Sequence, residues 1–200
     1  GRISSGQLLG LILIGLAGGS ALVLSSAERT SRVTNYIEQV KDINSERLES
    51  NSGYQAQQAH IAIARGGIIG VGIGKSTQRD FLPAPYNDFI FAIIAEEYGI
   101  IGSSAVMLIF IIILYRGIGV IARYSPDVLG TMMALGATLM ITLYGFVNAA
   151  VATGLFPVTG LPMPFISYGG TSMLFAGVMI GILLNISKHN RQIQNRFYNG

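Results

Sequence analysis

Four long apolar runs constrain the fold of this chain more than any other feature of its sequence. They cover residues 8–25, 100–122, 128–154 and 172–186. A helix needs roughly 20 apolar residues to cross the hydrocarbon core of a bilayer, and backbone groups cannot stay unpaired in lipid. The first three runs therefore predict membrane-spanning helices. The fourth run is short, and we expect it to borrow residues 165–171 to reach the far side.

The charged residues are too few and too unevenly distributed for a soluble globular protein. They make up 12% of the chain, whereas soluble domains carry roughly 25%. Nine of the ten acidic residues lie between Glu28 and Glu97, and the tenth is Asp127. This pattern excludes a disordered chain, a nucleic-acid-binding surface and an ordinary cytosolic enzyme. With no Cys there is also no disulfide, thiolate metal site or cysteine nucleophile. We therefore predict an all-α membrane protein.

The basic residues predict how the four helices are oriented. They precede the first run, separate the second from the third and follow the fourth (Arg2, Arg123, Lys188, Arg191 and Arg196). Because basic residues gather in cytoplasmic loops, we expect both ends of this chain in the cytoplasm. The two remaining loops, about residues 26–99 and 155–170, then lie outside the cytoplasm.

The long outer loop is expected to be structured. Residues 33–48 have the apolar spacing of an amphipathic helix, which would either lie on the bilayer or cap the bundle as a solvated helix. Residues 51–53 predict a break, and residues 54–64 predict a second short helix. A glycine-rich run, residues 66–76, follows it.

The glycine-rich run ends in Gly74-Lys75-Ser76, the ending of a phosphate-binding loop. The first glycine of that motif is missing, because its position holds Ile69. The run is therefore interpreted as a tight turn packed against helices. Lys75 and Arg79 are two cations close in sequence, and they would either bind a lipid pyrophosphate or simply contact lipid headgroups.

Asp88 is the most informative single residue, since it stands at the entrance to an apolar helix. It either stabilises the first turn of that helix through the helix dipole or acts as a general base. Glu96 lies eight residues further along the same helix face, roughly 12 Å away at 1.5 Å per residue. That separation is too large for a glycosidase carboxylate pair. Glu96 and Glu97 are therefore interpreted as a structural pair at a helix end.

The second outer loop, residues 155–170, contains three prolines and predicts a tightly folded path. Such backbone is tolerated at membrane depth only where it is buried in protein or lines a cavity. The Ser167 hydroxyl and the amides of Gly169 and Gly170 could bind a phosphate. No His or Asp lies nearby in sequence, which argues against a serine nucleophile. Inside the apolar runs, Asn148 and Asn185 are expected to form hydrogen bonds between helices.

Four stretches, residues 54–67, 70–79, 82–99 and 157–170, together resemble the C-terminal part of the SEDS proteins, the FtsW/RodA/SpoVE peptidoglycan polymerases of bacteria. The resemblance runs from about Gln7 to the tail. Members usually have about ten spans, so residues 1–200 look like a single membrane portion, the last four helices of a larger polytopic bundle. The motif around residues 74–78 leans toward FtsW.

The family pattern before the catalytic Asp departs from this sequence at three places. Ala84 stands where a Glu is usual, Tyr86 where a His is usual and Asn87 where a Thr is usual. The Asp itself is kept as Asp88. Because position 84 holds Ala, this chain has no Glu carboxylate there to assist Asp88.

The resemblance implies an inverting glycosyltransferase that polymerises lipid II outside the bacterial cytoplasmic membrane, in cell division or elongation. Asp88 is then the general base. The expected pyrophosphate or lipid II contacts are Lys75, Ser76, Gln78, Arg79, Ser167, Gly169 and Gly170. Two other functions stay open, a flippase for the lipid-linked precursor and a non-catalytic scaffold for a transpeptidase.

The resemblance also implies partners. These are a class B penicillin-binding protein transpeptidase, other division or elongation proteins and membrane lipids, but no nucleic acid. The sequence identifies no metal site and leaves a divalent cation as an open option.

Overall fold

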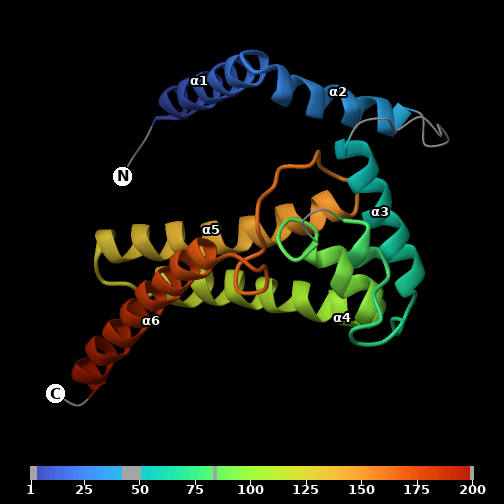
Figure 1. The fold of residues 1–200 in the computed structure, drawn as a ribbon. Coiled ribbons are helices and arrows are strands. Elements are labelled where there is room, and N and C mark those ends of the chain that lie inside the picture. Colours follow the sequence, from blue (N-terminus) through green and yellow to red (C-terminus); the bar gives the residue numbers. More distant parts are fainter. Residues whose placement is uncertain (1–3, 42–50, 83–84, 199–200) are drawn as a thin grey trace. The chain divides into compact units, whose positions relative to one another are not determined.

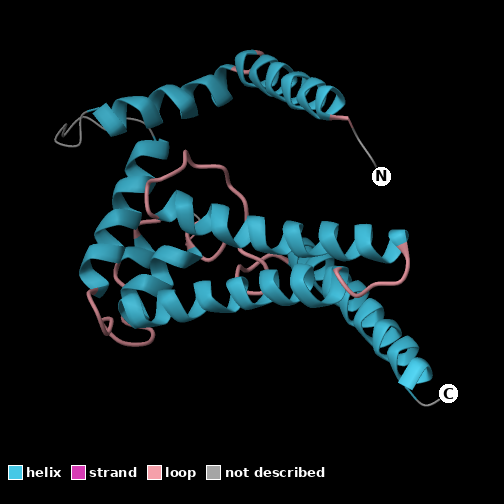
Figure 2. Cartoon of the chain, turned by 180° about the vertical axis from the view of Figure 1, so that it is seen from behind, coloured by secondary structure: helices cyan, strands magenta, loops and turns pink. Residues whose placement is uncertain are grey.

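The structure is a computed structural model, and it describes residues 4–41, 51–82 and 85–198. Within those ranges it is all-helical and contains no strand (Figure 1 and, from behind, Figure 2). The elements in chain order are α1 (Ser5–Leu24), α2 (Ala27–Lys41), α3 (Asn51–Gly66), η1 (Gln78–Asp80), α4 (Ile90–Tyr115), η2 (Arg116–Ala122), α5 (Val128–Ala152) and α6 (Gly170–Tyr198). The 3-10 turn η1 is short, and the π-helical segment η2 continues α4. The chain divides into two units, Gly1–Tyr54 and Gln55–Gly200.

The first unit consists mainly of α1 and α2. Helix α1 begins with a capping box, in which Ser4 and Gln7 each accept a hydrogen bond from the other's backbone N–H. At its other end, side chains at the start of α2 donate to the last carbonyls of α1, as Thr30 Oγ1 does to the carbonyl of Val23 (3.0 Å). No residue of α1 is buried. An apolar helix exposed on every side suits contact with lipid.

The second unit is built around α5. This helix packs against α4, η2 and α6, and it lies alongside α4 in both ribbon views (Figures 1 and 2). Half of its apolar window is buried, against 17% for α4 and 11% for α6. Its buried hydroxyls of Thr138 and Thr142 donate to carbonyls four residues back, at 2.7 and 2.8 Å. These two hydroxyls are thus satisfied within the helix, as a membrane interior requires.

Helix α4 is broken at Gly99, whose φ of 67° and ψ of −162° are non-helical. A break leaves carbonyls before it and N–H groups after it without partners in the helix. The turn after α3 supplies these partners. Carbonyls of residues 67 and 68 accept from the N–H groups of residues 100 and 101, and N–H groups of residues 71 and 72 donate to the carbonyls of Glu96 and Glu97. The turn therefore gives partners to four backbone groups of α4 at the break.

This backbone-to-backbone contact explains the glycine-rich run. A Cβ on Gly66 would overlap the carbonyl of Ala95, and one on Gly70 would overlap the carbonyl of Glu97. Side chains at these positions would push the turn away from α4. The expected tight turn packed against a helix is confirmed.

The expected number of long apolar helices is also confirmed. Four are long and apolar enough to cross a membrane, namely Ser5–Leu24, Ile90–Ala122, Val128–Ala152 and Gly170–Ile193. The predicted extension of the fourth is wrong, because α6 begins at Gly170 and residues 165–169 are not helical. The helix instead gains its length beyond Ile186.

The structure also bears on two expectations for the long loop. Residues 51–53 belong to α3, so the predicted break there is wrong. An amphipathic helix was expected at residues 33–48, and α2 covers this stretch as far as Lys41. Residues 42–50 lie outside the described residues.

Candidate functional site

Asp88 lies where two loops of the second unit meet. It is half-buried and is followed directly by Phe89, which is fully buried, and then by α4. Gly160 belongs to the loop between α5 and α6, and a Cβ placed on it would lie 3.7 Å from Asp88 Oδ2. The carboxylate of Asp88 therefore lies close to the α5–α6 loop.

The backbone that carries Asp88 is held by a set of three hydrogen bonds, which we call the carbonyl clasp. The carbonyls of residues 86–88 each accept one bond from the α5–α6 region. In chain order, the donors are the backbone N–H of Tyr168 (2.8 Å), the hydroxyl of Ser167 (2.7 Å) and the side-chain amide of Asn148 (2.9 Å). Three successive carbonyls are thus held by parts of the chain far away in sequence.

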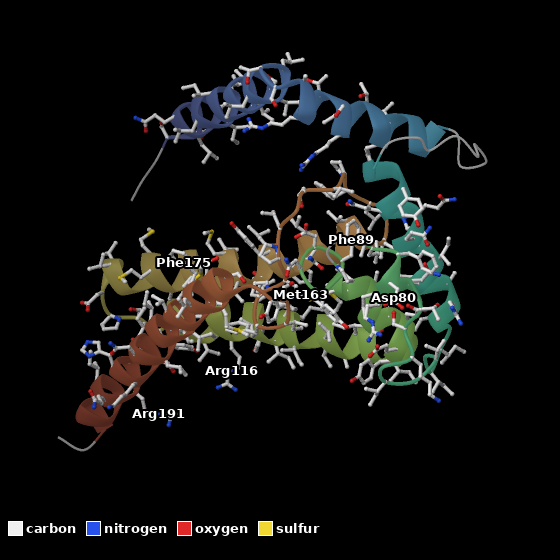
Figure 3. All side chains as sticks on the ribbon, viewed as in Figure 1. Asp80, Phe89, Arg116, Met163, Phe175 and Arg191 are labelled. Carbon is white, nitrogen blue, oxygen red and sulfur yellow. The ribbon has the colours of Figure 1, made fainter. Side chains whose placement is uncertain are left out.

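Two of the clasp donors also make hydrogen bonds with the backbone of the α5–α6 loop. Asn148 Nδ2 donates a second bond to the carbonyl of Leu161 (2.9 Å), and Ser167 Oγ accepts from the N–H of Met163 (2.7 Å). Both side chains are almost fully buried. Figure 3 labels Phe89 and Met163, two buried apolar residues of the hydrophobic core.

Arg79 connects the cation-bearing segment to the Asp88 segment. Its guanidinium donates to the hydroxyl of Tyr86 (3.4 Å), two residues before Asp88, and to Asp80 (3.4 Å). These contacts, with Tyr86 first, raise the pKa of Arg79 above its ordinary value. Arg79 is therefore a permanent cation beside the segment that carries Asp88. Lys75 is exposed in the same loop.

The segment of residues 76–78 is held by Glu96, in an arrangement we call the carboxylate anchor. The carboxylate of Glu96 is completely buried and accepts from the Ser76 hydroxyl, the Thr77 hydroxyl (3.3 Å) and the N–H groups of Thr77 (3.2 Å) and Gln78 (3.3 Å). The guanidinium of Arg65 forms an ion pair with it at 3.9 Å and also donates to Thr77 Oγ1. Buried charge needs this degree of compensation.

Some residues expected to bind substrate have other partners in the structure. Ser76 and Ser167 are buried, and their hydroxyls serve the carboxylate anchor and the carbonyl clasp. Gln78 is also buried, and its Oε1 has no hydrogen-bond partner within the described residues. Substrate contacts by these three side chains stay a prediction.

The two glycines of the α5–α6 connection that were expected to bind phosphate lie at the start of α6. The carbonyl of Gly169 accepts from the Ser172 hydroxyl (2.9 Å), and Gly170 is the first residue of α6. Their proposed phosphate contacts stay untested. Glu96 and Glu97 both stand just before the break at Gly99, and their interpretation as a structural pair stays a prediction.

The structure adds residues that sequence reasoning missed. Asn148 was expected to bond between helices, but it holds two loop carbonyls instead. Arg65 and Tyr86 were given no role, although each contacts a charged residue of the site. A polar side chain inside an apolar run was the only signal for Asn148, and it did not identify the partner.

The acidic residues do not suggest a metal centre. Among residues 4–41, 51–82 and 85–198, no group of three His, Cys, Asp or Glu side chains could hold a metal ion. A divalent cation for the reaction therefore stays an open option, without a site assigned to it.

Comparison with known proteins places this arrangement in a family. The FtsW/RodA/SpoVE family, described as cell cycle proteins, matches residues 2–192. Stage V sporulation protein E of Bacillus subtilis is 43% identical over 191 residues, which cover 95% of this chain and 50% of that protein. A protein of Halomonas elongata named "Probable peptidoglycan glycosyltransferase FtsW" is 37% identical over 93% of this chain and 47% of its own length.

A solved structure is also similar in fold. It is the structure of a peptidoglycan synthase complex that coordinates polymerization and crosslinking. The two folds match with a TM-score of 0.65, and the two sequences are 25% identical. It covers 92% of this chain and 49% of that one. The chain thus spans about half the length of the relatives it matches. From the family match, the identities and the shared fold, the chain belongs to the FtsW/RodA/SpoVE family of membrane proteins.

Proposed function

We propose that the protein is an inverting peptidoglycan glycosyltransferase that polymerises lipid II, with Asp88 as general base. The observation that carries this proposal is the setting of Asp88, a half-buried carboxylate beside Gly160 whose backbone is held by the carbonyl clasp. A general base must be held within reach of the proton that it removes. The names of the FtsW relatives support the same activity.

In the proposed reaction, Asp88 accepts the proton of the 4-hydroxyl of the acceptor saccharide. The acceptor oxygen forms a bond to C1 of the donor sugar from the face opposite the leaving group. The bond between C1 and the pyrophosphate oxygen breaks at the same time, which inverts the configuration at C1. The lipid pyrophosphate leaves with the electron pair of that bond, so negative charge grows on its oxygens.

Arg79 and Lys75 are proposed to stabilise that charge. Positive groups aimed at a developing charge are among the strongest contributors to catalysis, and a guanidinium matches phosphate geometry well. Arg79 is held near the Asp88 segment through Tyr86. The base and the cation would then act on opposite ends of the same bond exchange, on the acceptor proton and on the leaving pyrophosphate.

The setting in the cell is part of the proposal. We propose that the clasp end of the second unit faces outside the cytoplasmic membrane and that both ends of the chain face the cytoplasm. We further propose a class B penicillin-binding protein transpeptidase as partner, in division or elongation. The similar structure of a peptidoglycan synthase complex supports this partner.

A lipid II polymerisation assay tests the enzyme. The full-length purified protein should polymerise lipid II, and Asp88→Asn should lose activity by about 10²–10⁴-fold, the usual contribution of a general base. Asp127→Asn is the matched control, because Asp127 is an exposed acid at the opposite end of α5. A wild-type rate for Asp88→Asn would refute the general base. The flippase and the transpeptidase scaffold, which do not need this carboxylate, would then be favoured.

Cysteine labelling tests the orientation. The chain contains no Cys, so single cysteines introduced into it report one position each. A cysteine in place of exposed Phe156 should react with an impermeant reagent added to spheroplasts, whereas one in place of exposed Lys188 should react only after permeabilisation. Labelling of both positions from the same side would exclude the proposed topology.

A further inference from the structure

We infer that Asn148, a buried residue of α5, is a positioning residue for Asp88. By holding the backbone of Asp88, it sets the direction of the Asp88 carboxylate. This inference rests on the proposed function. It goes beyond that proposal because it assigns a catalytic consequence to a neutral side chain in a membrane-spanning helix.

Asn148 makes two hydrogen bonds that no other side chain could easily replace. Its single amide nitrogen donates to the carbonyl of Asp88 and to the carbonyl of Leu161, both at 2.9 Å. Carbonyls can only accept, so the nitrogen of the amide must face them and its orientation follows from the partners. Both hydrogens of the amide are thereby used.

The other half of the amide supports the same reading. Asn148 is 1% exposed, and its Oδ1 has no hydrogen-bond partner within the described residues. Leaving a buried acceptor without a hydrogen bond is unfavourable. The hydrogen bonds that Asn148 makes are therefore those of its nitrogen, which holds the carbonyls of both segments.

The two carbonyls belong to the two segments that meet at the Asp88 carboxylate. One is the carbonyl of Asp88 itself, and fixing it limits rotation of the backbone from which the side chain projects. The other follows Gly160, the residue whose Cβ position is 3.7 Å from Asp88 Oδ2. One side chain therefore fixes both the carboxylate and the loop surface beside it.

Asn148 lies on a helix that is suited to hold other segments in place. It belongs to α5, the most buried of the four long apolar helices. Sites held by helices are more precise than sites held only by loops. Ser167 and Tyr168 reinforce the arrangement by holding the two preceding carbonyls.

Replacing Asn148 with Leu in the full-length protein tests the inference, because Leu has a similar size and no donor. Misplacement of a catalytic group by about 1 Å can cost 10²-fold in rate. We expect kcat for lipid II polymerisation to fall at least about tenfold, with KM changing less than about threefold. Thr142→Val is the matched control, since Thr142 is buried on the same helix and its hydroxyl bonds only within that helix.

Ser167→Ala keeps the test decisive if Asn148→Leu does not fold. It removes the donor to the neighbouring carbonyl and should also lower kcat with little change in KM. A kcat per folded molecule close to wild type, or a rise in KM alone, would overturn the inference. Asp88→Asn separates the two proposals. If that variant is inactive while the clasp variants keep wild-type kcat, only the positioning role fails, and if it stays active, the general base fails first.

Discussion

Two short segments beside the first section of α4 contain or adjoin the charged residues of the proposed site. The two segments are held by hydrogen bonds of opposite direction. Residues 76–78 donate hydrogen bonds to a buried acceptor, the carboxylate of Glu96. Residues 86–88 accept hydrogen bonds from buried donors, through their carbonyls. The first segment is flanked by Lys75 and Arg79, and the second ends in Asp88.

The comparison separates two carboxylates that stand eight residues apart. Glu96 is completely buried and serves to hold a loop, with Arg65 beside it. Asp88 is half-buried, and the groups that hold its backbone are an amide, a hydroxyl and an N–H, all neutral. The backbone of Asp88 is thus positioned by neutral donors, whereas the carboxylate of Glu96 is itself the group that holds a loop.

The largest effect is expected when the carboxylate anchor is removed. Glu96→Ala leaves the buried Ser76 hydroxyl and the N–H of Gln78 without their acceptor and leaves Arg65 without its counter-charge. Leaving a buried donor without its acceptor costs about 1–3 kcal/mol for each group. We expect a corresponding fall in thermal stability of the full-length protein in detergent. Glu96→Gln, which keeps the size and one acceptor, should lose less, and equal losses for both would contradict the anchor.

The next effect concerns the reach of Asp88. Asp88→Glu keeps the charge and leaves the clasp donors in place, but it moves the carboxylate by about a bond length. We expect turnover to fall by roughly 10²-fold with little change in thermal stability. Steady-state polymerisation and an unfolding curve would measure this, with Asp127→Glu as control. A stability loss as large as that of Glu96→Ala would show that the two carboxylates are not used differently.

Much of this arrangement could be predicted from sequence, because it depends on local patterns. The apolar runs gave the long helices, and the glycines gave the close turn against α4. The start of α6 at Gly170 was not predicted, since tertiary contacts of the clasp keep Ser167 and Tyr168 out of the helix. Hydrogen bonds between residues far apart in sequence leave no periodic signal.

The two carboxylates show the same limit. The position of Asp88 before an apolar helix singled it out in the sequence, whereas the buried contacts of Glu96 with residues 76–78 are visible only in the structure. Ser76 and Ser167 were both expected to contact substrate. Only the structure shows that a carboxylate and a carbonyl already bind those hydroxyls.

A smaller effect is expected at the contact that links the two segments. Arg79→Gln removes the charge and the contact with Tyr86, and we expect kcat/KM for lipid II to fall about tenfold, within the range of one charged hydrogen bond. Arg79→Lys keeps the charge but not the planar fork, so it should lie between wild type and Arg79→Gln. Arg191→Gln, at an exposed site near the far end of α6, is the control (Figure 3). If all three variants behave alike, Arg79 has no specific role.

The smallest effect is a pH dependence on the clasp side. Burial lowers the pKa of His60 below its ordinary value, and its Nε2 lies 2.5 Å from the Cβ position of Gly154, where the α5–α6 loop begins. As pH falls below about 6.5, the unfolded protein binds a proton that the folded protein still refuses, so stability falls until the folded pKa is reached. We expect the unfolding midpoint to drop more between pH 7.5 and 5.5 in the wild type than in His60→Gln. Exposed His189→Gln should keep the wild-type drop, and equal drops in all three proteins would show that His60 carries none of the effect.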